Sequence, residues 1–344
     1  MRVAESMKVA QYDQYGAARD VLRIIEAPVP EPRPDELLVR VRASSVNPID
    51  CALRSGYGRE FFETRATLPL RPGRDVAGDV VRVGVAVTTF SPGDEVYASV
   101  FYGANAEYIA VPAAHAALKP SSLNFREAAA LPFAALTAWT ALVKAAGLNE
   151  RSTPGQRVVI PRGAGGVGSV GIQLVKAWGG YVASTCSTRN VDLVRSLRAD
   201  LVLDHTKEDL RGKLQGFDVA FDTSFDTEQV LLHALKINAG ARYVSVVSPK
   251  LRLIDQFGLE AGLKEGDRLL AENVRAQAAL GRSYAWVFTE LDGDALQSIA
   301  QLVDAGRIRP VVNQVFPFER IAEAHEYCEA ARAPGRIVID LQAS

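Results

Sequence analysis

A glycine-rich stretch, PRGAGGVGSVGIQLVKAW at residues 161–178, holds the residues of this chain whose spacing most clearly suggests chemistry. Gly163, Gly165 and Gly168 have the spacing G-x-G-x-x-G, between the apolar residues 158–160 and an amphipathic run. In a strand–turn–helix setting the first glycine permits a tight turn, the second admits a pyrophosphate, and the third lets helix and strand pack closely. The helix N-terminus adds free N–H donors. We predict a dinucleotide-binding loop; the alternative is a purely structural turn.

The residues that follow the next apolar run indicate which dinucleotide is bound. NAD-specific sites usually place an Asp or Glu at the end of the second strand, where it holds the ribose hydroxyls. Here residues 181–189, YVASTCSTR, contain no acid. Ser187 can donate to a phosphate, and the planar cationic group of Arg189 can pair with one. We predict NADP(H); the alternative is that Arg189 only caps the next helix.

The cysteines and histidines show no metal-binding spacing. The three cysteines, Cys51, Cys186 and Cys328, are far apart and form no CxxC pair. This pattern argues against a disulfide framework and against a cysteine-rich zinc site. The four histidines are dispersed, and three of them are interpreted as surface or packing residues: His115, His233 and His325.

Composition excludes several function classes. The 344 residues carry a formal net charge of -1, with 48% hydrophobic and 23% charged residues. A chain this neutral has no bulk electrostatic attraction for nucleic acid or for anionic membranes. The most apolar run, residues 131–148, is interrupted by Lys144, so we expect a packed helix and no membrane span. Residues 1–16 lack an apolar signal region, which predicts a cytoplasmic protein, although a chain trimmed of its presequence would look the same.

Two styles of sequence place these residues in two domains. Residues 1–125 consist of short β-type runs broken by Pro and Gly. From residue 126 apolar strands alternate with helices, which predicts an α/β fold with a parallel sheet covered on both faces. The strands are expected at 157–161, 181–187, 201–205, 217–224 and 242–248. We predict a β-domain over 1–125, a dinucleotide-binding domain over 126–270, and a segment 271–344 that ends the parallel sheet and returns to the first domain.

Taken together, these motifs carry a family resemblance. The glycine loop, VNPIDCALRSGYG at 46–58, LPLRPGRDVAGDVVRVG at 68–84 and ALPFAALTAWTAL at 130–142 resemble the medium-chain dehydrogenase/reductase superfamily, specifically its zinc-independent quinone oxidoreductase branch. The likeness covers nearly the whole chain. It implies a GroES-like β-domain, a Rossmann domain, NADPH as reductant, a cofactor cleft between the domains and a homodimer.

The resemblance also identifies the positions at which zinc-dependent relatives hold their catalytic metal. Those relatives have a Cys where this chain has Asn47, and a His where it has Arg74. Arg has no lone pair to offer a metal, and Asn is a poor ligand compared with thiolate or imidazole. The lobe of four closely spaced cysteines that binds structural zinc in those relatives is absent. We therefore expect no zinc.

Without a metal, the substrate must accept hydride without strong Lewis-acid help, as quinones and enones do. The enzyme then contributes mainly positioning, and the cofactor carries the difficult step. Asn47 is the candidate for orienting nicotinamide or substrate, and Tyr57 is a candidate donor to a developing oxyanion. The alternative for Tyr57 is a loop aromatic that only covers the cleft. Asp50 is expected to fix its own loop by accepting backbone N–H bonds.

The resemblance implies further cofactor contacts, position by position. Ala164, Gly166 and Val167 lie on the pyrophosphate turn, with Ala164 at the usual place of a Ser. His205 stands where relatives carry a Tyr near the 2′-phosphate. Later strand ends and the returning tail supply the remaining positions: Thr223, Val246, Trp286, Val287, Phe288, Gly335, Arg336 and Ile337.

Two other functions fit the same residues. An NADPH-dependent enone or enal reductase shares every feature named above. A non-catalytic NADPH-binding scaffold is the alternative from another class, and the intact glycine loop argues against it because a scaffold need not keep a pyrophosphate site. The neutral charge argues against an RNA-binding role. We predict a quinone oxidoreductase-like reductase with a small-molecule substrate.

Overall fold

The structure of the protein is a computed structural model that describes residues 4–64, 67–330 and 334–342. It divides into two compact units. Unit 1 is formed by Met1–Phe133, Leu291–Ala305 and Pro310–Ser344, and unit 2 by Ala134–Glu290 and Gly306–Arg309. The boundaries of these units differ from the domain boundaries predicted at residues 125 and 270, because the units are defined by contacts in the fold, whereas the predicted boundaries follow changes in the sequence pattern.

Unit 2 contains a six-stranded parallel sheet with the strand order β10-β9-β8-β11-β12-β13. Its strands are β8 (Arg157–Ile160), β9 (Tyr181–Cys186), β10 (Leu201–Asp204), β11 (Val219–Asp222), β12 (Arg242–Ser245) and β13 (Ser283–Trp286). The order reverses direction between β8 and β11, which is the switch point where doubly wound sheets bind ligands. The predicted α/β fold and its first strands are confirmed. The edge strand β13 lies in the segment 271–344 that was expected to end the sheet, at residues that the sequence analysis did not specify.

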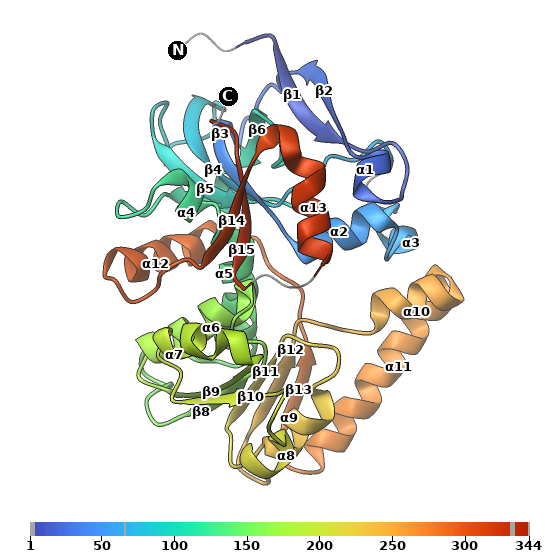
Figure 1. The fold of residues 1–344 in the computed structure, drawn as a ribbon, viewed down its shortest axis with the longest axis vertical. Coiled ribbons are helices and arrows are strands. Elements are labelled where there is room, and N and C mark those ends of the chain that lie inside the picture. Colours follow the sequence, from blue (N-terminus) through green and yellow to red (C-terminus); the bar gives the residue numbers. More distant parts are fainter. Residues whose placement is uncertain (1–3, 65–66, 331–333, 343–344) are drawn as a thin grey trace. The chain divides into compact units, whose positions relative to one another are not determined.

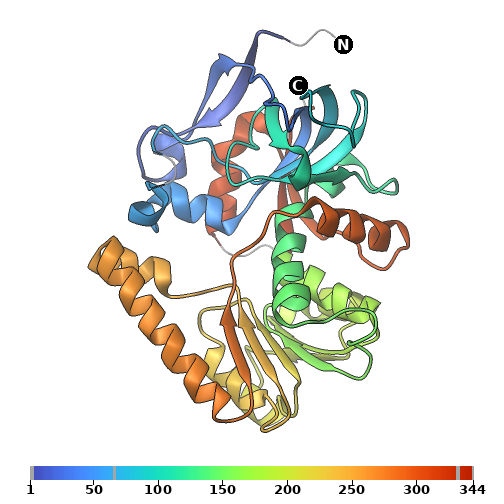
Figure 2. The same ribbon diagram turned by 180° about the vertical axis from the view of Figure 1, so that it is seen from behind.

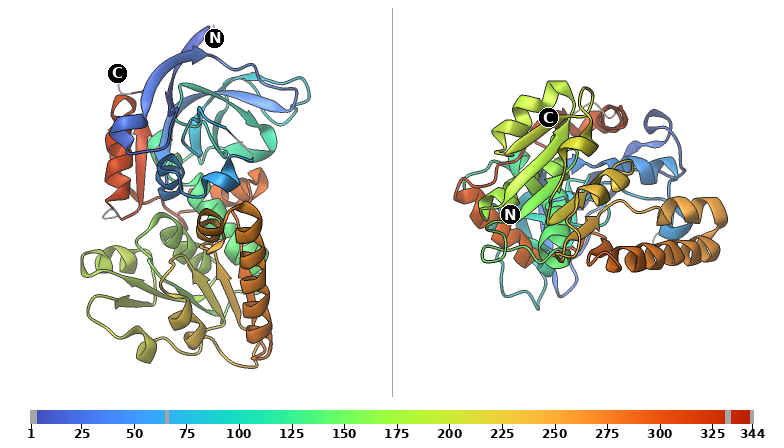
Figure 3. Two further views of the ribbon diagram at one scale, coloured as in Figure 1. Left: turned by 90° about the vertical axis from the view of Figure 1, so that its right-hand side faces the viewer. Right: turned by 90° about the horizontal axis from the view of Figure 1, so that it is seen from below.

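Helices cover both faces of this sheet (Figure 1; Figure 3, left). They are α5 (Pro132–Trp139), which enters unit 2 and continues as a π-helix (Thr140–Ala145), α6 (Gly166–Ala177), α7 (Val191–Ser196), α8 (Leu210–Lys213), α9 (Glu228–Ala234), α10 (Lys250–Phe257) and α11 (Leu259–Ala278), with a 3-10 turn at Thr188–Asn190. The central strand residues Val158, Val159 and Ile160 have 0% exposure, as strands covered on both faces must.

A helical pair, α10 and α11, adds a feature that the sequence analysis did not identify. The two helices lie side by side (Figures 1 and 2). Gly262 of α11 makes this approach possible, because a Cβ there would lie 2.4 Å from the Ile254 Cα of α10.

Unit 1 is built on a seven-stranded sheet with the order β14-β15-β3-β4-β5-β7, in which β6 also pairs with β3. A separate two-stranded sheet joins β1 to β2. The strands are β1 (Ser6–Gln11), β2 (Arg23–Pro28), β3 (Glu36–Val46), β4 (Asp75–Val83), β5 (Glu95–Ser99), β6 (Tyr108–Pro112), β7 (Ala116–Leu118), β14 (Val312–Pro317) and β15 (Arg336–Asp340). The tail returns to the first strands of the chain, because β15 pairs antiparallel with β3.

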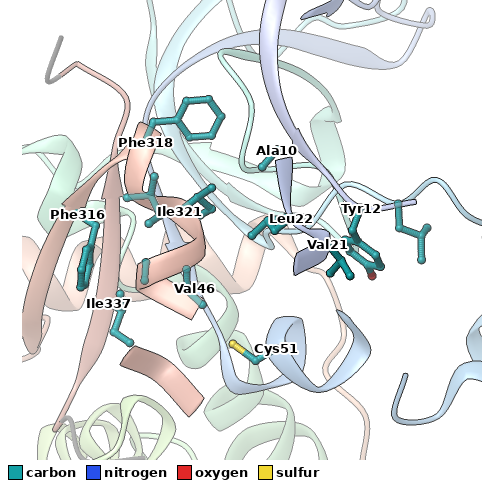
Figure 4. Close-up of a cluster of buried hydrophobic side chains, with 13 residues drawn as sticks. Ala10, Tyr12, Val21, Leu22, Val46, Cys51, Phe316, Phe318, Ile321 and Ile337 are labelled. Carbon is teal, nitrogen blue, oxygen red and sulfur yellow. The ribbon is translucent and has the colours of Figure 1, made fainter. Parts of the chain in front are cut away.

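Short helices complete unit 1. They are α1 (Ala18–Val21), α2 (Pro48–Ser55), α3 (Arg59–Phe62), α4 (Phe125–Ala128), α12 (Gly293–Asp304) and α13 (Ile321–Glu329), with 3-10 turns at Ala113–His115 and Phe318–Arg320. A buried apolar cluster fixes α13 against β15 and the N-terminal elements; Figure 4 shows Phe316, Ile321, Val46 and Cys51 within it. This cluster holds the tail and α2 in one core.

One helical stretch of the described chain, Phe125–Ala145, is long and apolar enough to cross a membrane, with a mean hydropathy of 1.4. Of its most apolar window, 72% is buried inside the protein. Such burial is the environment of a core helix.

Candidate functional site

The glycine turn between β8 and α6 has the predicted strand–turn–helix form. Gly165 precedes α6 as its N-cap residue, with φ −74° and ψ 166°. A Cβ on Gly163 would lie 2.1 Å from the Ser184 Oγ of β9, and a Cβ on Gly168 would lie 2.5 Å from the Arg162 carbonyl oxygen. The first and third glycines are therefore required by packing of the turn against its own backbone and against β9.

The second glycine keeps its side of the turn open. Among the residues that the structure describes, and apart from the two chain neighbours, a Cβ on Gly165 would come within 4 Å of the Arg162 carbonyl oxygen alone, at 3.3 Å. None of the motif glycines has a positive φ; the left-handed residue of the turn is Arg162, with φ 53°. The motif therefore leaves space at Gly165 for a ligand, whereas Gly163 and Gly168 leave space for protein.

The start of α6 offers N–H donors to an anion. The first intrahelical bond runs from the Ser169 N–H to the Gly165 carbonyl at 2.9 Å. The N–H groups of Gly166, Val167 and Gly168 lie ahead of it, where an α-helix has no internal acceptors. The first turn of α6 carries no acidic residue. These donors and the helix dipole suit a pyrophosphate group.

The predicted phosphate-recognition residues stand at neighbouring strand ends. Ser187 and Arg189 follow β9, and His205 follows β10, which pairs with β9. The His205 N–H donates to the Cys186 carbonyl at 3.1 Å, which joins the two loops. Arg189 and His205 are exposed, and Ser187 is half-buried. The three side chains therefore share one edge of the sheet.

One acid in this region was missed by the sequence analysis. Asp204, at the end of β10, accepts hydrogen bonds from the Thr188 hydroxyl and from the Thr206 N–H and hydroxyl. These bonds lower the pKa of Asp204 to about 2, with Thr188 the largest cause. The carboxylate therefore stays ionised while it orders the loop after β9. The ribose-binding acid of NAD-specific sites is expected at the end of the second strand, whereas Asp204 ends the third.

The remaining predicted residues of unit 2 also lie at this edge of the sheet. The Thr223 hydroxyl donates to the Pro161 carbonyl at 2.9 Å, so it fixes the start of the glycine turn. The backbone N–H groups of Val246 and Val287 continue the pairing beyond β12 and β13 by donating to the Asp222 and Ser245 carbonyls.

Aromatic residues occupy the end of β13. The Trp286 indole N–H donates to the Tyr284 hydroxyl at 2.8 Å, and Phe288 is 59% exposed. The carboxyl edge of a parallel sheet is where doubly wound folds bind nucleotides. The edge residues named above therefore meet the geometric requirement for cofactor contact, and their roles remain predictions.

In unit 1 a buried polar network surrounds Asn47. Asn47 is 1% exposed, and its Nδ2 donates to the Asp75 Oδ2 at 2.9 Å. Arg336 Nη2 donates to the same Asp75 oxygen at 2.6 Å, and the Ser45 hydroxyl bonds it as well. Asn47 is therefore held in one orientation by a buried ion pair that joins β4 to β15.

Asp50 and Arg74 form a second buried ion pair beside this network. The Asp50 Oδ2 accepts from the Asn47 N–H at 2.9 Å, as expected for a carboxylate that fixes its own loop. Its Oδ1 lies 3.2 Å from the Arg74 Nε. Burial raises the pKa of Asp50, and the Arg74 charge opposes that rise. The Arg74 guanidinium also lies 5.0 Å from the Phe133 ring centroid and 5.5 Å from that of Tyr102.

The other predicted residues of unit 1 lie in a turn and in the tail. Tyr57 is half-buried in the turn that follows α2, and its N–H donates to the Ala52 carbonyl. Gly335 has φ 68°, and a Cβ there would lie 2.2 Å from a backbone oxygen. The Arg336 side chain is engaged by Asp75, and Ile337 is 4% exposed in the core. If Arg336 and Ile337 contact the cofactor, they do so through backbone atoms, because their side chains are buried and engaged within unit 1.

The residues at the expected metal positions do not form a metal centre. Within residues 4–64, 67–330 and 334–342, no group of three or more His, Cys, Asp or Glu side chains is arranged to hold a metal ion. Arg74 brings a cation to one of these positions, and a guanidinium has no lone pair for a metal.

Two family models match the chain. The alcohol dehydrogenase GroES-like domain matches residues 33–121, and the zinc-binding dehydrogenase matches residues 197–339. The quinone oxidoreductase structure from Coxiella burnetii is similar to this chain with a TM-score of 0.81 at 28% identity, and the match covers 98% of this chain and 99% of that one. The predicted pairing of a GroES-like domain with a doubly wound sheet is confirmed.

Curated relatives are similar over almost the whole chain. The mitochondrial NAD(P)H oxidoreductase RTN4IP1 of Danio rerio is 37% identical over 348 residues, covering 96% of this chain and 90% of the relative. The chloroplastic NADPH-dependent alkenal/one oxidoreductase of Arabidopsis thaliana is 35% identical, covering 98% of this chain and 80% of the relative.

The predicted cytoplasmic location is wrong. The Danio rerio relative is named as mitochondrial and the Arabidopsis thaliana relative as chloroplastic. A targeting segment is separate from the domains that fold around the cofactor. Composition of the folded domains therefore carries no information about the compartment.

Proposed function

Because the chain belongs to the medium-chain dehydrogenase/reductase superfamily, we propose that it is an NADPH-dependent reductase that transfers hydride to a quinone or a conjugated carbonyl. The observation that carries this proposal is the open side of Gly165 at the N-terminus of α6, beside the switch point of the parallel sheet. Relatives named as NAD(P)H, alkenal/one and quinone oxidoreductases support the same class of reaction.

NADP(H) fits the residues that surround this turn. Gly166 and Val167 would hold the pyrophosphate through backbone N–H groups at the start of α6, beside the open side of Gly165, and Ala164 offers none of the hydroxyl contact that a Ser would add. Ser187, Arg189 and His205 share the edge where a 2′-phosphate would sit. Arg189 favours a phosphate there by charge. When bound, the cofactor supplies the hydride.

We propose that the reaction needs no zinc. Arg74 is buried near two aromatic rings and paired with Asp50, so it fills a ligand position with a cation. Asn47 is held by Asp75 as a fixed amide, which suits a residue that orients a neighbour. Tyr57 is the proposed donor to the substrate oxygen, and solvent water supplies the final proton.

A panel of acceptors tests this proposal. The purified protein is given NADPH or NADH with a benzoquinone, a 2-alkenal or a saturated aldehyde, and oxidation of the nicotinamide is followed by absorbance. We expect turnover with NADPH and a conjugated acceptor, and none with the saturated aldehyde. Tight NADPH binding without turnover on any acceptor would instead support the scaffold function.

Two variants separate binding from chemistry. Tyr57→Phe removes only the hydroxyl, so kcat should fall by about 100-fold or more with NADPH affinity unchanged, in line with general acid contributions. Gly166→Val places a side chain beside the proposed pyrophosphate, so it should abolish both binding and turnover in a folded protein. Higher activity on 2-alkenals than on quinones would favour the enone reductase, as the name of the Arabidopsis thaliana relative suggests. The homodimer is a further proposal, which sedimentation of the purified chain tests.

A further inference from the structure

Two cysteines that are far apart in the sequence meet where α2 packs against α13. Cys51 lies on α2 and Cys328 on α13, and the two helices are in contact. Figure 4 shows Cys51 projecting from α2 into the apolar cluster that α13 covers. Cys51 is 3% exposed, whereas Cys328 is partly exposed at the edge of the same cluster. One thiol is therefore shielded from solvent and the other is accessible.

Residues three positions apart share a helix face, so Cys328 lies on the face of α13 that carries His325. The Cys51 Sγ lies 3.5 Å from the His325 Nδ1 and 3.6 Å from the His325 carbonyl oxygen. Burial lowers the pKa of His325 to about 3, so its imidazole is neutral at physiological pH. Cys51 is therefore surrounded by acceptors and is held as a protonated donor.

The charges around the pair make the two sulfurs unequal. The hydrogen bond from Cys51 lowers the pKa of the Cys328 thiol, and the Arg336 charge acts in the same direction. Burial and the carboxylates of Asp50 and Glu329 oppose this effect without reversing it. The same bond and burial raise the pKa of Cys51. Since the thiolate is the nucleophile, Cys328 is the thiol that reacts first.

We propose that Cys51 and Cys328 form a redox modification site, which hydrogen peroxide converts to a disulfide between α2 and α13. The Cys328 thiolate attacks a peroxide oxygen, the O–O bond breaks, and Cys328 becomes a sulfenic acid. The leaving hydroxide takes a proton and becomes water. The Cys51 sulfur then attacks the Cys328 sulfur, the S–O bond breaks, and the hydroxyl leaves as water with the Cys51 proton. Two thiols are oxidised by two electrons, and one peroxide is reduced to two waters.

The disulfide would link α2 to α13, two helices whose neighbouring residues along the chain belong to the polar network around Asn47. Asn47 precedes α2, and the chain beyond α13 leads to Arg336 on β15. The site is independent of the proposed reductase activity, because both thiols belong to unit 1 and the glycine turn belongs to unit 2. Its test therefore uses the covalent product and not turnover.

The experiment is peptide mapping of the full chain without reduction. The reduced protein is treated with hydrogen peroxide, remaining thiols are alkylated, and tryptic peptides are analysed by mass spectrometry. We expect the peptides 43–54 and 321–332 to be joined and two hydrogens lighter than their sum. The control is Cys186→Ser, which removes the buried cysteine of unit 2 and should leave this product unchanged.

Two single variants test the order of reaction. In Cys51→Ser, Cys328 should stop at the sulfenic acid, which dimedone traps. In Cys328→Ser, Cys51 should stay a free thiol under the same peroxide dose. The proposal is overturned if the wild-type chain yields no joined peptide, if the bond forms to Cys186, or if Cys51 reacts with dimedone in Cys328→Ser.

Discussion

The neighbouring glycines Gly165 and Gly168 should respond oppositely to the same substitution. Gly165→Ala adds a Cβ on the open side of the turn, whose nearest neighbour is a carbonyl oxygen at 3.3 Å. Gly168→Ala adds a Cβ that would lie 2.5 Å from the Arg162 carbonyl oxygen, closer than a real Cβ approaches. The first change should weaken cofactor binding and spare stability, and the second should reduce stability.

The size of each effect follows from the geometry. Gly165 has φ −74° and ψ 166°, which any L-residue adopts, so alanine there stabilises by roughly 0.4–1 kcal/mol through the unfolded state. The added Cβ holds the pyrophosphate away from the N–H donors of α6, and loss of one hydrogen bond to a charged phosphate costs about 1.5–3 kcal/mol, which weakens NADPH binding about 10- to 150-fold. At Gly168 an overpacking cost of about 1–3 kcal/mol is opposed by about 1 kcal/mol of better helix propensity. The net loss is up to about 2 kcal/mol, and we expect the upper part of this range because the clash is with backbone, which cannot move aside as a flexible side chain does.

The assay pairs thermal unfolding without ligand with calorimetric titration by NADPH. Gly165→Ala should melt at or slightly above the wild-type temperature and bind poorly. Gly168→Ala should melt roughly 2–4 °C lower for each kcal/mol lost, on the scale of a domain of 150–250 residues. If Gly165→Ala binds NADPH within twofold of wild type, the turn is not the pyrophosphate cradle. If Gly168→Ala melts at the wild-type temperature, the packing account of the third glycine is refuted.

Arg189→Ala should weaken NADPH binding by on the order of 1–3 kcal/mol and leave NADH binding unchanged. Arg195→Ala, a change at an exposed arginine, should alter the affinity for neither cofactor. Equal affinities for NADPH and NADH in the wild-type chain would contradict the assignment. Elemental analysis should find no stoichiometric zinc, because Arg74 occupies a ligand position, and one zinc per chain would refute this. His325 is neutral in the fold down to about pH 3 but titrates near its usual 6.5 when unfolded. Between about pH 3 and 6.5 the unfolded chain therefore binds more protons than the folded chain. The free energy of unfolding of the protein should fall as the pH drops through this range, by up to about 1.4 kcal/mol per pH unit. Urea titrations of His325→Gln should show a shallower pH slope, and an unchanged slope would contradict the burial effect.

Local pattern determined the parallel sheet and its glycine turn. Residues 158–160 are apolar and fully buried, as expected for a central strand. The spacing of the glycines that follow is typical of a tight turn from such a strand into a helix, here α6. Strand ends follow from the same local signals, so the strands that precede Ser187 and His205 could be predicted. The role of His205 came from the family resemblance, and the structure showed that the two strands are neighbours. The long α11 was missed because few of its residues are buried, which leaves a weak apolar stripe to recognise.

Only the tertiary structure decided which distant residues meet. Arg336 reaches Asp75 across 261 positions, and Cys51 reaches His325 across 274, because β15 pairs with β3 and α13 packs on α2. A sequence pattern specifies the face that a strand or helix buries, but not the partner that covers it. The network around Asn47 and the thiol pair therefore depend on long-range packing, whereas the glycine turn depends on about a dozen consecutive residues.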